Sequence, residues 1–203
     1  MRIVLATANP GKQREFAALL AAPGWGGASH ELILQSALGI VPIEETGSSF
    51  EANALLKARH AARESGLAAL ADDSGLEVDA LEGRPGVHSA RYAGASASDA
   101  DNNARLLEEL GAVPRGSRRA RYRCVLALVQ HAEDRAPLLA EGVWEGQIAT
   151  AAAGSGGFGY DVLFIPEGLE VTAAQLPAER KHTLSHRAQA LQGLRAALAS
   201  RAP

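Results

Sequence analysis

Ile3-Val-Leu-Ala-Thr-Ala-Asn-Pro-Gly-Lys12 opens the chain with a short apolar run followed by a turn. The run Ile3–Ala6 predicts a strand, and the Asn-Pro-Gly sequence after it favours a tight turn. Phe16, Leu19 and Leu20 then recur at helical spacing. The chain therefore begins strand, loop, helix, which is typical of an α/β fold.

The next segments predict a second strand, a capped helix and a buried strand. Leu32–Leu34 is the second apolar stretch, and a glycine-rich link at 23–29 precedes it. Ser48 followed by Glu51 matches a capping box, so we expect a helix to begin there. Leu67–Ala71 then predicts a buried strand that ends in the acidic turn Asp72-Asp-Ser-Gly75.

The second half of the chain is richer in strands. Ser98 is expected to cap a helix, and the segments 121–130 and 143–148 predict an antiparallel pair. Val162–Ile165 predicts another strand, and a last helix begins at about Ser185. Its apolar side is expected to carry Leu184, Leu191, Leu194 and Leu198. The pattern predicts one α/β domain over residues 1–203 with a mixed β-sheet.

Composition excludes several classes of protein. The 203 residues are 47% hydrophobic and 21% charged, which is typical of a globular protein. A net charge of −3 gives no overall positive field for nucleic acid, and no segment approaches the roughly 20 apolar residues of a membrane span. Cys124 is the only cysteine, so no internal disulfide can form. We expect a soluble, cytoplasmic protein that binds neither membrane nor nucleic acid.

The first loop is a candidate phosphate-binding segment. It consists of Thr7, Ala8, Asn9, Pro10, Gly11 and Lys12. A loop that leads into a helix N-terminus presents free backbone N–H groups and the positive end of the helix dipole, both of which suit phosphate. The alternative is a simple tight turn. The segment is not a Walker loop, because Gln13 stands where Ser or Thr would be needed.

Cations near the start of the last helix are a second feature of interest. Lys181, His186 and Arg187 lie there, where the helix dipole disfavours positive charge unless an anion binds among them. A bound phosphate would supply that anion. The alternative is that a neighbouring carboxylate such as Glu179 neutralises the group.

Asp72 and Asp73 bring two carboxylates to the end of a buried strand, where their mutual repulsion must be offset. Magnesium (Mg²⁺) does this well, since it binds one or two carboxylates together with substrate phosphates. Glu44 and Glu45 could add a further ligand. The alternative is an ordinary solvated turn.

The glycine-rich segment Gly154–Gly159 fits the G-x-G-x-x-G pattern of dinucleotide-binding folds, but a strand follows it where those folds need a helix. We therefore expect a loop whose rings, Phe158 and Tyr160, stack on a base. The basic run at 115–123 is better explained by alternation on a solvent-facing strand than by nucleic-acid binding.

Six motifs in this order resemble the inosine triphosphate pyrophosphatase family, and the match extends from Leu5 to Leu191. The motifs are Ala6-Thr-Ala-Asn-Pro-Gly-Lys12, Glu45-Thr-Gly-Ser-Ser-Phe-Glu-Ala-Asn53 with Lys57, Ala71-Asp-Asp-Ser-Gly-Leu76, Pro85-Gly-Val-His-Ser-Ala-Arg-Tyr92, Gly157-Phe-Gly-Tyr-Asp161 and Ser185-His-Arg187. The chain departs from the family pattern at Val162, where proline is expected, so the loop before it is expected to be slightly less rigid.

The resemblance implies an elongated mixed β-sheet flanked by helices, with two lobes and the site in the cleft, and usually a homodimer. It implies that Asp73 is the general base and that Asp73 and Glu45 are Mg²⁺ ligands. Asp72 is a further candidate ligand, and the alternative is that it only tunes Asp73. The substrate-binding residues it implies are Thr7 to Lys12, Asn53, Lys57, Ser74, Phe158, Gly159, Tyr160, Asp161, Lys181, His186 and Arg187. Asn53 and Lys57 are four residues apart and therefore share one helix face.

The expected activity is hydrolysis of non-standard purine nucleoside triphosphates (ITP, dITP and XTP) to the monophosphate and pyrophosphate. Two alternatives stay open: a pyrophosphatase of modified pyrimidine nucleotides, and a non-catalytic nucleotide-binding protein. A nucleic-acid-binding module comes last, because the charge disfavours it.

Overall fold

A six-stranded mixed sheet runs through the protein, whose computed structural model describes residues 2–21 and 31–201. The strand order is β2-β1-β3-β4-β5-β6, and the strands are β1 (Arg2–Leu5), β2 (Glu31–Leu34), β3 (Ala68–Val78), β4 (Arg119–Val129), β5 (Leu138–Ile148) and β6 (Phe164–Pro166). β1 is parallel to β2 and β3, whereas β5 and β6 are antiparallel. The predicted mixed α/β fold is thus confirmed, and the predicted link at 23–29 lies outside the described residues.

The chain divides into two compact units. Unit 1 comprises Met1–Asp73, Cys124–Gly142 and Arg187–Pro203, and unit 2 comprises Ser74–Arg123 and Val143–His186. Each unit has an apolar core of its own. That residues 1–203 form a single domain stays a prediction.

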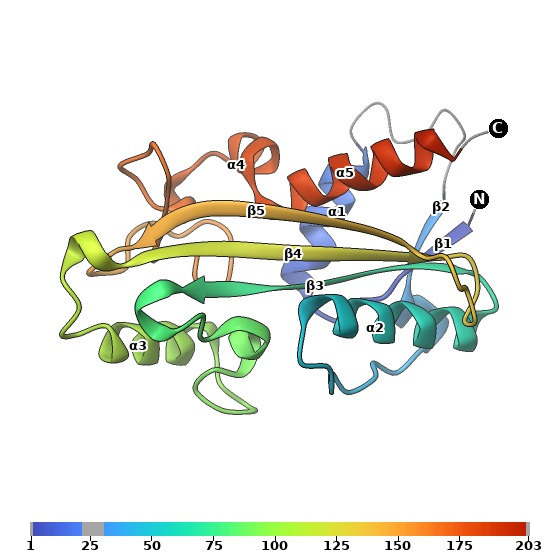
Figure 1. Ribbon diagram of the computed structural model, residues 1–203, viewed down its shortest axis with the longest axis horizontal. Coiled ribbons are helices and arrows are strands. Elements are labelled where there is room, and N and C mark those ends of the chain that lie inside the picture. Colours follow the sequence, from blue (N-terminus) through green and yellow to red (C-terminus); the bar gives the residue numbers. More distant parts are fainter. Residues whose placement is uncertain (1, 22–30, 202–203) are drawn as a thin grey trace. The chain divides into compact units, whose positions relative to one another are not determined.

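Unit 1 has helices on two sides of its strands. α1 (Pro10–Ala21) and α5 (His186–Ser200) contribute Phe16, Leu191 and Leu194 to the core that they share with β1, β3 and β4. α2 (Phe50–Ser65) lies on the other side of β3 (Figure 1). Side chains that alternate along β3 therefore meet different helices.

The ends of α2 follow from local chemistry. Ser49 is the N-cap, and its side chain accepts a hydrogen bond from the N–H of Ala52. The predicted cap at Ser48 is therefore wrong by one residue, because burial of Phe50 at the first helical position sets the register. Gly66 ends the helix with φ of 67°, a left-handed conformation that glycine adopts without strain.

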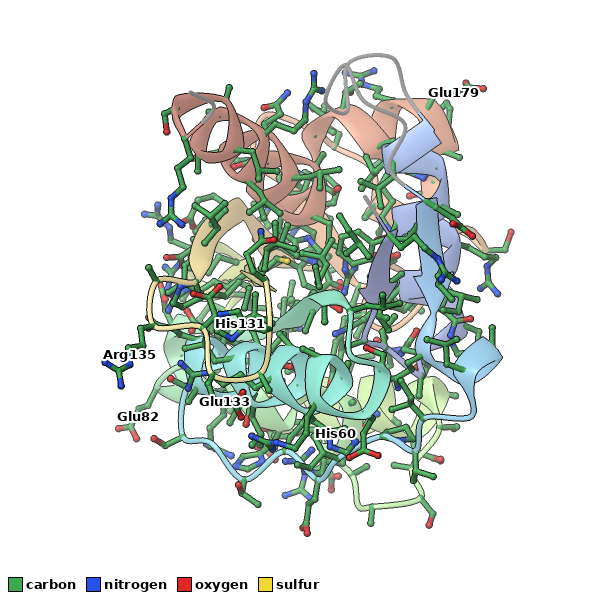
Figure 2. All side chains as sticks on the ribbon, turned by 90° about the vertical axis from the view of Figure 1, so that its right-hand side faces the viewer. His60, Glu82, His131, Glu133, Arg135 and Glu179 are labelled. Atoms are coloured by element: carbon green, nitrogen blue, oxygen red, sulfur yellow. The ribbon has the colours of Figure 1, made fainter. Side chains whose placement is uncertain are left out.

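The loop between β4 and β5 lies beside α2, as Figure 2 shows with His131, Glu133, Arg135 and His60 labelled. Arg59 of α2 donates to the carbonyl of Asp134 at 3.3 Å. The Nη2 atom of Arg63 lies 3.6 Å from a carboxylate oxygen of Glu133. These contacts fasten the loop to the helix.

β3 is longer than predicted and passes straight through the acidic segment. The predicted strand ended at Ala71 with Asp72-Asp-Ser-Gly75 as a turn, but β3 continues to Val78. Residues 68–73 are all buried, as in a strand covered on both faces, and each aspartate has charged partners there. The predicted turn is therefore wrong.

Unit 2 is built on α3 (Asp99–Glu109) and α4 (Ala178–Leu184). The predicted cap at Ser98 is confirmed, because Ser98 and Asp101 form a full capping box. α4 was not predicted, and it carries Leu184, which is exposed and does not belong to the last helix. β6 begins at Phe164, two residues after the predicted start.

The basic run at 115–123 faces solvent only in part, whereas its alternation predicts a solvent-facing strand. Arg121 and Arg123 pair with Glu77 across the sheet. Arg118 is buried instead and donates to the carbonyls of Leu110, Val113 and Ala149. Among the described helices, none has the length and apolarity that crossing a membrane requires.

Candidate active site

The loop between β1 and α1 is held in one shape by its own side chains. Asn9 Oδ1 accepts the backbone N–H of Lys12 at 3.1 Å and so caps α1, while Pro10 occupies the first helical position. Thr7 Oγ1 accepts the N–H of Asn9 at 3.2 Å. Gly11 lies in the first turn of the helix, where backbone N–H groups lack partners within the helix. The segment thus has the form that phosphate binding requires, and its contact with phosphate stays a prediction.

Asp73 faces α2. Asn53 Nδ2 donates to one of its carboxylate oxygens at 3.0 Å, and Lys57 Nζ contacts the other at 3.0 Å. The same ammonium also contacts Glu45 Oε1. Asn53 Oδ1 accepts the N–H of Gly47 at 2.7 Å, so one side chain connects the strand to the acidic loop. The predicted shared face of Asn53 and Lys57 is confirmed.

Asp72 faces the opposite way. Lys12 Nζ lies 2.8 Å from Asp72 Oδ2, and Arg187 Nε lies 3.5 Å from the same oxygen. Arg187 Nη1 also donates to Glu15 Oε2 at 2.8 Å. Successive side chains of a strand point to opposite faces, which is why the two aspartates meet different helices.

Glu15 also belongs to this group, although none of the predicted site residues includes it. It is buried, and it follows Lys12 by three residues, so both side chains emerge on one face of α1. That spacing of a carboxylate from the loop lysine is the signal that was available in the sequence.

Burial and charge shift the pKa values of this cluster in different directions. Burial raises the pKa of Asp73, even though the nearby ammonium groups of Lys57 and Lys12 oppose the shift. Burial would also raise the pKa of Asp72, but Lys12, Arg187 and Lys57 outweigh it and hold that pKa well below its usual range. Burial alone would lower the pKa of Lys57, and attraction to Asp73, Asp72 and Glu45 raises it overall.

The carboxylates around Lys57 fit a cation that binds few protein ligands. Glu45 and Asp73 converge on one ammonium, and when ionised they leave one negative charge in excess. Among the described residues no group of three or more His, Cys, Asp or Glu side chains gathers as a metal site. Mg²⁺ needs only one or two carboxylates when phosphates complete its shell, so the two residues suit it. Asp72 instead contacts Lys12 and Arg187.

In unit 2, the loop 157–161 forms the second group of predicted site residues. Lys181 Nζ donates to Asp161 Oδ2 at 2.6 Å and lies 5.3 Å from the centre of the Phe158 ring. The Tyr160 hydroxyl donates to the carbonyl of Ser89, so that ring is buried in the core of unit 2. Phe158 is half-buried and is therefore the more accessible of the two rings.

Two predicted site residues remain, Ser74 within β3 and His186 at the start of α5. Ser74 is half-buried in β3, and His186 is buried at the start of α5, stacked on Tyr122 with ring centres 4.7 Å apart. Glu179 is exposed and points outward (Figure 2). The alternative in which Glu179 neutralises the cations is wrong for Lys181 and Arg187, because Asp161 pairs with the first and Glu15 with the second.

Comparison with known proteins places these residues in a family context. Residues 3–197 match the model of the Ham1 family. The chain is 57% identical over 200 residues to the dITP/XTP pyrophosphatase of Methylococcus capsulatus, covering 98% of this chain and 95% of that one. It is 53% identical to the dITP/XTP pyrophosphatase of Yersinia pseudotuberculosis, covering 94% of each. Among solved structures, the HAM1 protein of Coxiella burnetii superposes with a TM-score of 0.88 at 45% identity, covering 98% of this chain and 99% of that one.

Proposed function

The chain belongs to the Ham1 family, and we propose that it hydrolyses the non-standard purine nucleoside triphosphates dITP, ITP and XTP to the monophosphate and pyrophosphate. Two relatives that are identical to it at more than half of the aligned positions carry the name dITP/XTP pyrophosphatase. The proposed role in the cell is to clear such nucleotides from the pool.

The observation that carries the proposal is the different environment of the two aspartates on β3. Asp73 accepts one hydrogen bond on each carboxylate oxygen, from Asn53 and from Lys57. A carboxylate has about four lone-pair sites, so each oxygen retains one for a further donor or a cation. Burial raises the pKa of Asp73, which makes it a better proton acceptor. Asp73 is therefore placed to orient a water molecule and take its proton.

In the proposed reaction, the oxygen of that water attacks the α-phosphorus and the bond from this phosphorus to the bridging oxygen breaks. The electron pair leaves with pyrophosphate, and the water proton goes to Asp73. Lys12 and the N-terminus of α1 bind the phosphates, since cationic and backbone N–H donors lie together there. Asn53 and Lys57 hold the Asp73 carboxylate in one orientation.

Glu45 and Asp73 would hold the magnesium ion that we propose as cofactor. When bound, Mg²⁺ supplies positive charge that offsets the charge developing on the phosphate oxygens. In this proposal Asp72 is not a ligand, because Lys12 and Arg187 already neutralise it. Its role is to keep those two cations in position.

Selectivity is proposed to depend on the six-position of the purine, which is a carbonyl in hypoxanthine and xanthine and an amino group in adenine. Arg187 is proposed to donate to that carbonyl, because a guanidinium is a donor only and cannot accept from an amino group. A site that hydrogen-bonds a substrate group rejects analogues lacking it by as much as ~10⁴ to 10⁵-fold.

A pyrophosphate-release assay tests the activity directly. Initial rates are measured for dITP, XTP, dATP, dGTP and a modified pyrimidine triphosphate, with Mg²⁺ and with a chelator. We expect release from dITP and XTP with Mg²⁺ only, and at least ~10²-fold slower release from dATP. Equal rates for dATP and dITP would overturn the role of Arg187. Fastest release from the pyrimidine nucleotide would favour the pyrimidine alternative, and binding of dITP without release would favour the non-catalytic one.

Assembly and location are further parts of the proposal. We propose a homodimer in the cytoplasm, as the family resemblance implies. Sedimentation of the purified full-length chain tests the assembly, and a monomer at micromolar concentration would contradict it.

A further inference from the structure

Gly159 is held through both of its backbone groups by two residues of α3. Its N–H donates to Asp99 Oδ2 at 2.7 Å, and its carbonyl accepts from Asn103 Nδ2 at 2.9 Å. Asn103 Nδ2 also donates to the carbonyl of Asp99, one turn earlier, at 2.7 Å. We call Asp99 and Asn103 the α3 clamp. The clamp fixes Gly159 in a left-handed conformation, with φ of 62°.

The orientation of the Asn103 amide is fixed by its surroundings. Two carbonyl oxygens lie at hydrogen-bond distance from Nδ2. If Nδ2 and Oδ1 exchanged places, the amide oxygen would face these two oxygens with no donor between them. Asn103 is 8% exposed, and among the described residues nothing donates to its Oδ1. A buried polar atom without a partner reduces stability. The side chain of Asn103 therefore holds Gly159 although its own Oδ1 reduces the stability of the fold.

The predicted base-binding loop is also held at a second place, beside Phe158, by Asp161 and Lys181. The N–H of Phe158 donates to Asp161 Oδ2 at 2.9 Å, and the same oxygen accepts from Lys181. A Cβ atom on Gly157 would come within 2.0 Å of that oxygen, so the loop closes tightly on Asp161. Asp161 and Lys181 thus fasten the loop on one side of Phe158, and the α3 clamp fastens it on the other.

We propose that Asp99 and Asn103 are positioning residues that set how selectively the loop 157–161 recognises the base of a purine nucleoside triphosphate. The inference rests on the proposed function, because it takes the loop to contact the base. Neither residue bonds to Glu45, Lys57 or Asp73, so loosening the clamp should weaken recognition of the base and leave the chemical step largely intact.

α3 offers a matched control in the neighbouring residue. Asn102 is also buried, and its amide also fastens a loop, accepting from the N–H of Ala93 at 2.8 Å and donating to the carbonyl of Ala90 at 3.3 Å. That loop holds no predicted substrate-binding residue. Asn102→Ala and Asn103→Ala therefore each remove one buried side-chain amide from α3, and only the second removes a bond to Gly159.

The first turn of α3 supplies a second pair of variants. Asp99→Ala removes the acceptor for the Gly159 N–H, whereas Asp99→Asn keeps an oxygen there and should restore the bond. Asp101→Ala removes the capping-box bonds to Ser98 and serves as a control for the helix end.

The experiment measures kcat and KM for dITP and dATP with Mg²⁺ in the full-length protein and these variants. We expect Asn103→Ala and Asp99→Ala to raise KM for dITP about tenfold, to leave kcat within about threefold, and to reduce the preference for dITP over dATP. Asp99→Asn should resemble the unsubstituted protein. Asn102→Ala and Asp101→Ala should lower the melting temperature without raising KM.

Three results would overturn the inference. In the first, KM and selectivity of Asn103→Ala match those of Asn102→Ala while the unsubstituted protein hydrolyses dITP, and the proposed function then survives. In the second, the unsubstituted protein neither releases pyrophosphate from dITP nor binds it in equilibrium dialysis, and both proposals then fail. If dITP binds without hydrolysis, the clamp is supported by weaker dITP binding in Asn103→Ala than in Asn102→Ala, and overturned by equal binding.

Discussion

Asp72 and Asp73 are neighbours in the chain, yet their carboxylates belong to two different ion-pair groups. Lys12 Nζ lies 2.8 Å from Asp72, and Lys57 Nζ lies 3.0 Å from Asp73. The alternation of β3 sends one carboxylate towards α1 and α5 and the other towards α2. The first has two basic partners that neutralise it, and the second shares the ammonium of Lys57 with Glu45. This difference makes the roles of the two residues separable by experiment.

Replacing Asp73, the proposed general base, should stop turnover without unfolding the protein. Asp73→Asn keeps the size of the side chain but removes its ability to take a proton, so kcat should fall about 10² to 10⁴-fold. Pyrophosphate release and binding of dITP are measured side by side, and binding should persist. Near-normal kcat in this variant would contradict the assignment of Asp73.

Replacing the other aspartate should act on stability. Asp72→Asn removes a buried carboxylate that contacts the partly buried Lys12 and the buried Arg187, and breaking a buried pair typically costs about 3 to 5 kcal/mol. Urea denaturation measures the loss. Glu31→Gln is the control, because Glu31 pairs with Arg2 at an exposed position and its loss should cost under about 1 kcal/mol. A similar effect of both substitutions would refute the role of Asp72 as a buried counter-ion.

Removing the ammonium that bridges Glu45 and Asp73 should change metal and nucleotide binding in opposite directions. Lys57→Met keeps an unbranched side chain one atom shorter but leaves two carboxylates facing each other, so a divalent cation should bind more tightly without nucleotide. KM for dITP should rise, since one cation that is proposed to face the phosphates is lost. Titration calorimetry with Mg²⁺ alone measures the first effect, and unchanged Mg²⁺ affinity would show that lysine and metal do not compete.

A substitution at Gly146 in β5 tests the packing between the last two strands of unit 2. A Cβ atom there would lie within 2.4 Å of the Ile165 carbonyl oxygen and within 2.7 Å of the Phe164 ring. Gly146→Ala should therefore destabilise the protein by about 1 to 3 kcal/mol. Gly116→Ala, where a Cβ would meet nothing within 4 Å, is the control in thermal unfolding. Equal melting temperatures for the two variants would argue against close packing at Gly146.

Tyr92 should ionise at a higher pH than a tyrosine in an unfolded chain. Burial and its hydrogen bond to Glu109 raise the pKa of Tyr92 to about 12, against about 10 in an unfolded chain. The protonated form is favoured by folding, so this contribution to stability is complete below pH ~10 and is lost as the pH rises through ~12. Ultraviolet titration follows the step, which Tyr92→Phe removes. Glu109→Gln should lower the pKa, and an unchanged pKa would contradict the role of Glu109.

Local patterns in the sequence determined the elements that depend on neighbouring residues. The loop and the helix start at residues 7–12, the capping box at Ser98 and the shared face of Asn53 and Lys57 all follow from contacts within one or two turns of chain. The error at Ser48 arose within the same range, since two adjacent serines both satisfy the local chemistry and only burial of Phe50 distinguishes them.

Only the tertiary structure decided how the charged residues pair. Nothing local shows that β3 continues through Asp72 and Asp73, because its length depends on partners far along the chain that neutralise each carboxylate. The pairing of Glu15 with Arg187 and the hold of Asp99 and Asn103 on Gly159 join segments 56 to 172 residues apart. Such contacts depend on which faces the fold brings together, and sequence spacing carries no information about that. The motifs therefore fixed the chemistry that is present, and the packing of helices on the sheet assigned each group its partner.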